Sequence, residues 1–145
     1  MAATIEEGLV AYLLADTAIK ALVVDRISPW AGQGEALPRI TYAVISTEDE
    51  SVLAASSYQP KVRIQLDVWG QTRAQARALT LLVKNSKGGA GGSNLRDFGA
   101  ASLGGIWVQS VDLENEMDGE DAPQDMTGRP VPRISLDLLI AFKEP

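Results

Sequence analysis

Residues 61–69 read Lys-Val-Arg-Ile-Gln-Leu-Asp-Val-Trp, and this stretch decides the fold. Apolar side chains occupy every second position from Val62 to Val68, so they share one face of an extended chain. The other face carries charged and amide groups, and Gly70 ends the stretch. The pattern predicts a β-strand with one buried face, against which the rest of the chain has to pack.

The same alternation returns elsewhere in the chain. It is clear in residues 39–45 and 106–113, and residues 25–30 read as a short strand stopped by proline. Residues 133–143 form the last such stretch. Its predicted core face carries Ile134, Leu136, Leu138, Ile140 and Phe142. These stretches predict one β-sheet.

Capping residues predict the helices. Thr4 and Glu7 form a capping-box pattern before an apolar stripe, and Thr72 with Gln75 repeats it after the first strong strand. Asp16 is placed to cap a second, shorter helix. We therefore predict an α+β fold with a single mixed, mostly antiparallel sheet, helices packed on one face, and one domain spanning residues 1–145.

The chain contains neither cysteine nor histidine. Disulfides and thiolate chemistry are therefore excluded, as are catalytic sites that depend on an imidazole. An enzyme built on this sequence would have to use carboxylates, lysine or serine alone. No apolar run approaches the roughly 18 residues of a membrane span. We expect no cofactor, no metal and no membrane association.

The net charge of −6 is concentrated near the end of the chain. Residues 1–111 hold ten basic and ten acidic residues, whereas residues 112–145 hold nine acidic residues against Arg129, Arg133 and Lys143. The sequence shows no basic patch interleaved with aromatic residues. This disfavours tight binding of nucleic acid.

The acidic segment sets a carboxylate at every second position, which on an extended chain places all of them on one side. They are Asp112, Glu114, Glu116, Asp118 and Glu120. The spacing does not match an EF-hand loop, and nothing indicates the pocket that paired catalytic carboxylates need. These observations disfavour calcium binding and carboxylate catalysis; a solvated loop is the most common role of such a charge run, and a functional acidic surface is the remaining alternative.

Two segments are predicted to be long surface loops, at residues 47–60 and 87–105. The second is rich in glycine, but it lacks the Gly-Lys-Ser/Thr of a phosphate loop and follows a predicted helix, which disfavours nucleotide binding. We expect both loops to become ordered on contact with a partner. The candidate contact residues are Glu48, Val52, Leu53, Tyr58, Leu95 and Phe98.

Several segments resemble the tail-completion family of long-tailed phages and prophages, also called tail terminators. In chain order they are residues 25–29 (Asp-Arg-Ile-Ser-Pro), 37–42 (Leu-Pro-Arg-Ile-Thr-Tyr), 62–69 continued by 72–76 (Thr-Arg-Ala-Gln-Ala), and 131–137. The resemblance spans nearly the whole chain. It rests on fold-forming patterns and includes no catalytic signature.

The resemblance implies a structural protein of the virion at the head-proximal end of the tail, assembled in the host cytoplasm. Members of the family form hexameric rings that stop polymerisation of the tail tube and present a surface to the head connector. The implied partners are further copies of the chain, the tail tube protein and a connector or stopper protein, with DNA passing through the lumen without specific binding. In such a ring we expect Asp112, Glu114, Glu116 and Asp118 to face the lumen.

Two other functions remain as alternatives. A stopper subunit of the head-tail connector has a similar size and also forms rings. A carboxylate-dependent hydrolase would use acids such as Asp118 or Glu120.

Overall fold

The computed structural model describes residues 4–29, 36–51, 58–88, 94–121 and 131–142. In chain order the elements are helices α1 (Ile5–Ala15) and α2 (Thr17–Val23), strands β1 (Ile27–Pro29), β2 (Arg39–Ser51) and β3 (Tyr58–Trp69), helix α3 (Arg73–Lys84), the 3-10 turn η1 (Leu95–Asp97), and strands β4 (Gly99–Leu103), β5 (Ile106–Asp121) and β6 (Val131–Phe142). The predicted α+β class with one mixed sheet is confirmed.

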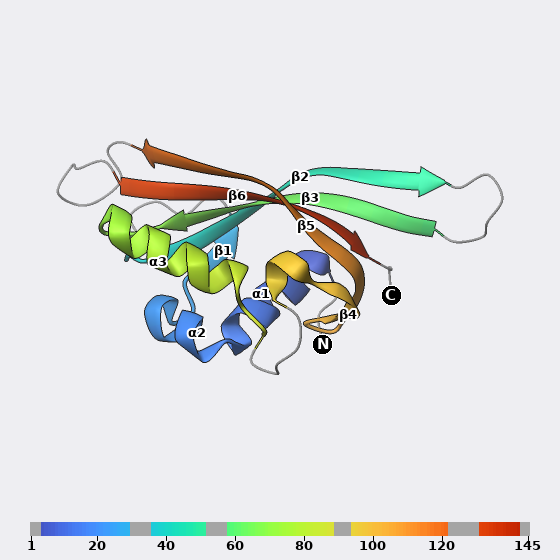
Figure 1. The fold of residues 1–145 in the computed structure, drawn as a ribbon, viewed down its shortest axis with the longest axis horizontal. Helices are drawn as coiled ribbons and strands as arrows, with labels where there is room; N and C mark the ends of the chain where they lie inside the picture. The colour runs from blue at the N-terminus through green and yellow to red at the C-terminus, as the bar shows by residue number, and fades with distance from the viewer. Residues whose placement is uncertain (1–3, 30–35, 52–57, 89–93, 122–130, 143–145) are drawn as a thin grey trace.

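The sheet has six strands in the order β1-β2-β3-β6-β5-β4. Only β1 and β2 run parallel, and every other neighbouring pair is antiparallel. The three α-helices lie together below one face of the long, twisted sheet (Figure 1). Among the described residues no helix covers the opposite face, which we call the open face.

The helices begin where their capping residues predict. The Thr4 hydroxyl accepts a hydrogen bond from the backbone N–H of Glu7, and the Thr72 hydroxyl accepts one from the N–H of Gln75. One carboxylate oxygen of Asp16 accepts the N–H groups of the first turn of α2. These bonds satisfy backbone donors that a helix cannot satisfy internally. Within the part of the chain that the structure describes, no helix has the length and apolar character needed to cross a bilayer.

The core lies between the sheet and the helices. Cross-strand rows such as Ile64, Leu138 and Leu113 point toward the helices, as the alternation in the sequence predicts. From below, α3 contributes Leu79 and α1 contributes Leu13, and neither side chain is accessible to solvent. Burying one such side chain contributes roughly 1.5–3 kcal/mol, so this layer is the main source of stability.

The backbone of helix α1 lies directly against the backbone of the β4–β5 turn. Gly104 has φ +58°, and a Cβ on it would lie 2.1 Å from the carbonyl oxygen of Gly8. A Cβ on Gly8 would lie 2.6 Å from the carbonyl oxygen of Leu103. Glycine is required on both sides of this contact because any side chain would force the two backbones apart.

The predicted loop at residues 47–60 is wrong in its bounds. Strand β2 continues to Ser51 and β3 begins at Tyr58, with these two residues paired in an antiparallel ladder. A bulge at Ile45 shifts the register, so the apolar alternation stops while the strand continues. Of the predicted contact residues, Glu48 and Tyr58 lie in these strands, and their side chains are outside the described part. Val52 and Leu53 lie outside the described residues.

The predicted loop at residues 87–105 is also wrong in part, because it contains η1 and β4. Leu95 and Phe98 are buried in the core rather than available as contacts. The N–H of Leu95 donates to the carbonyl of Ser86, and the ring of Phe98 meets that of Tyr12 edge-on at 5.7 Å. Two large apolar side chains therefore anchor the end of this glycine-rich segment.

Candidate functional surfaces

The acidic strand β5 does not keep its carboxylates on one face. Leu113 pairs with Leu138 and Asn115 pairs with Asp137, so Glu114 is an extra residue in a β-bulge. Beyond the bulge, Glu116 stands opposite the buried Leu136 and takes the helix side of the sheet. The expectation of one-sided carboxylates is therefore wrong, because a single extra residue reverses the alternation.

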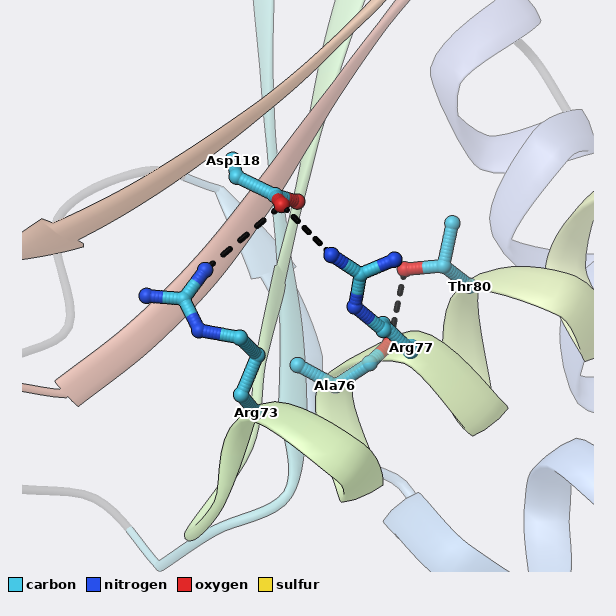
Figure 2. A network of polar contacts seen from close by, with 5 residues as sticks. All are labelled: Arg73, Ala76, Arg77, Thr80 and Asp118. Carbon is cyan, nitrogen blue, oxygen red and sulfur yellow. Dashed lines mark hydrogen bonds and ion pairs between the residues drawn. The ribbon is translucent and has the colours of Figure 1, made fainter.

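On the helix side, two carboxylates of β5 meet the basic side chains of α3. The Asp118 carboxylate lies 2.9 Å from the Arg77 guanidinium and 3.5 Å from that of Arg73 (Figure 2). Glu116 accepts a hydrogen bond of 2.6 Å from the ammonium group of Lys84. Together these ion pairs connect residues 116–118 of β5 to α3.

On the open face, Glu114 lies 2.6 Å from the Arg63 guanidinium, which reaches it from β3 across β6. Asp112 shares a cross-strand row with Arg63, is exposed, and forms no ion pair with any residue that the structure describes. Of the four acids predicted to line a lumen, two therefore lie on each side of the sheet. The placement of these residues within an assembly stays a prediction.

The open face carries a second polar cluster. The guanidinium carbons of Arg39 and Arg133 lie 5.1 and 5.6 Å from the ring centroid of Trp69, whose indole N–H donates to the Thr41 hydroxyl. Next to it, the buried carboxylate of Asp67 accepts a 2.6 Å hydrogen bond from Ser135. These contacts order the open face where β2 begins and β3 ends, without a covering layer of helices among the described residues.

Within the described ranges no group of three or more metal-ligating side chains occurs. The contacts at Asp118 have a structural explanation, since two guanidinium groups share one carboxylate oxygen. Glycosidase-type hydrolysis requires a second carboxylate across a pocket, whereas the described ion-pair partners of Asp118 are cations. The side chain of Glu120 lies outside the described part.

The sequence from residue 7 to residue 118 matches the family described as tail completion protein gp17. The chain belongs to this family. The family consists of structural proteins of the phage tail and is not a family of enzymes. This confirms the resemblance that the fold-forming segments carry in the sequence.

The fold is similar to that of a chain in the virion of a native gene transfer agent (GTA) particle. The TM-score is 0.68 at 16% sequence identity, over 94% of this chain and 92% of that chain. At this identity the likeness concerns the fold alone. Among curated proteins, no sequence matches this member of the tail completion family.

Sequence reasoning identifies the acids of this family member but misses the cations that face them. Arg73 and Arg77 stand four residues apart and so occupy one face of α3, which is a signal visible in the sequence. The position of the bulge has a weaker signal. After Leu113 the positions in phase with the core are Asn115, Met117 and Gly119, of which only Met117 is apolar, so the alternation weakens there.

Proposed function

We propose that the chain is the subunit of a ring that ends the phage tail tube and provides the surface for head-tail joining. The observation that carries the proposal is the family match over residues 7–118. A ring subunit needs two different contact surfaces, one for each neighbour, because head-to-tail contacts close by rotation. The sheet supports this role, since its two outermost long strands have different sequences and different surroundings.

We also propose that Asp112 and Glu114 face the lumen of this ring, with the negative charge supplied by Asp112, because Glu114 is paired with Arg63. Both belong to the open face, where repeated carboxylates would keep passing DNA from binding. Glu116 and Asp118 have a different role in this proposal, which is to hold β5 against α3. A structure of the assembled ring with Asp112 on its outer rim would overturn the assignment.

Deleting the gene and measuring tail length by electron microscopy tests the function. We expect tubes longer than those of the wild type, and plasmid-borne wild-type protein should restore the normal length. Tails of normal length that fail to join heads would identify the chain as a stopper subunit instead. Normal, infectious particles would contradict both structural roles.

A further inference from the structure

We propose that the edge of β2 at residues 43–51 forms an antiparallel ladder with the edge of β5 at residues 112–121 of a second copy of the chain; among the described residues no strand covers either of these edges, and we call them the free edges. This inference rests on the proposed ring and supplies its subunit contact. Both edges belong to the long sheet, one on each side of it. Repeating one such contact between unlike edges continues the sheet from copy to copy and allows a ring to close.

Short strands cover the two outer edges at opposite corners. Strand β1 pairs with residues 40–42 of β2, and β4 pairs with β5 only as far as Ser110. In the register of the sheet, the covered Thr41 shares a row with the uncovered Met117. A neighbour displaced along the strands therefore brings the two uncovered segments together without a collision between β1 and β4. Closed barrels have a stagger of the same kind.

Strand direction favours the pairing. Strands β2 and β6 run the same way, since each is antiparallel to β3, and β5 runs opposite to both. When a neighbour continues the sheet by rotation about an axis along the strands, its β2 meets β5 in antiparallel orientation. Antiparallel ladders are slightly more stable per residue than parallel ones.

The two edges also expose apolar side chains that the pairing would cover. Ile45 and Val44 on β2 are 53% and 45% exposed, and Met117 on β5 is 58% exposed. A long free edge with apolar side chains promotes association with other chains unless a partner covers it. Within the described part of the chain, residues 49–51 of β2 and 58–60 of β3 pair only with each other, and an isolated pair of strands is marginally stable in water.

The charges on β5 permit this contact. Glu114, Glu116 and Asp118 each lie against a cation of their own chain, so most of the negative charge described on that edge is compensated internally. Residues 43–47 of β2 are uncharged, and the acidic residues of this strand begin at Glu48. The uncharged run is the part of β2 best suited to accept β5 of the neighbour.

The absence of cysteine from the chain makes disulfide trapping a direct test. The double variants Ile45→Cys with Met117→Cys, and Ser46→Cys with Met117→Cys, place one thiol on each free edge at exposed positions. The full-length variants are oxidised both as concentrated purified protein and in lysates of cells that assemble particles. We expect a ladder of linked multimers, with the 45–117 or 46–117 disulfide identified by mass spectrometry. The three single-cysteine variants can give dimers only.

A ladder of multimers that lacks these disulfides overturns the proposal. The proposal is also overturned if variants with wild-type circular dichroism form no link in either preparation. Dimers of the Ile45→Cys single variant alone would show that β2 pairs with itself, which also overturns it. Rings that form and restore tail length without the link would reject this contact and leave the proposed function intact. The link together with unchanged tail length after gene deletion would reject the proposed function and leave the contact intact.

Discussion

The helices are attached to the sheet in two different ways, one at α1 and one at α3, which we call the α1 side and the α3 side. Besides the apolar side chains that α1 buries in the core, Gly8 of α1 meets the β4–β5 turn backbone to backbone, and the Tyr12 hydroxyl donates to the carbonyl of Ser86 in the segment after α3. At α3 an apolar stripe packs against the sheet, and exposed ion pairs to β5 surround it. The first attachment tolerates almost no change in shape, whereas the second depends on charges that solvent and salt reach. Changes on the α1 side should therefore cost more stability.

The largest effect is expected for Gly104→Ala. The φ of +58° is unfavourable for alanine, and its Cβ would lie 2.1 Å from a backbone oxygen, so the α1 contact has to open. We expect a loss of about 3–4 kcal/mol and a fall in Tm of roughly 10 °C. Gly99→Ala is the matched control because its Cβ would meet only the Gln109 oxygen, at 3.9 Å. Equal losses in chemical denaturation for both variants would show that the backbone contact is unimportant.

A smaller effect is expected for Tyr12→Phe on the same side. The variant removes the hydroxyl that donates to Ser86, whose carbonyl keeps the N–H of Leu95 as a donor, so we expect a loss of about 1 kcal/mol near neutral pH. Burial, with the nearby Asp16 carboxylate, raises the pKa of Tyr12 from 10.0 to about 12.

The pH dependence separates this role of Tyr12 from general packing. Because the pKa of Tyr12 is higher in the folded state, its contribution is complete below pH 10 and is lost as the pH rises toward about 12. Urea titrations across this range should show a steeper loss for the wild type than for Tyr12→Phe. Tyr42 accounts for part of the pH dependence that remains in Tyr12→Phe. Its pKa is also raised, by burial and by the charges of Glu6 and Glu7. Identical slopes would exclude the coupling.

On both sides the sequence predicts the elements but not the tertiary contacts between them. Capping residues and alternation are local, so Thr4, Thr72 and residues 61–69 predict their elements correctly. Phe98 is buried against Tyr12, which is distant in the sequence, and Leu95 is held by Ser86, from which a glycine-rich run separates it. Local composition indicated a loop there because it contains no information about those tertiary contacts.

The acidic strand shows the same limit for the candidate site. The sequence identifies which residues of β5 are acidic, yet the single bulged residue, Glu114, decides which face of the sheet each carboxylate takes. Bulges follow from register and twist between strands, which a single alternating pattern does not specify. The cations that pair with these acids lie on β3 and α3, so their roles follow from tertiary structure.

The smallest effect is expected for Asp118→Asn on the α3 side. Both guanidinium partners are substantially exposed, so the loss should be about 0.5 kcal/mol in low salt. It should disappear near 1 M salt, where the screening length falls to about 3 Å. Asp112→Asn is the control because Asp112 forms no ion pair with the described residues, and it should leave stability unchanged. A loss at Asp118 that does not depend on salt would mean that its carboxylate contributes through packing rather than charge. Packing, and not ion pairs, would then attach both α1 and α3 to the sheet.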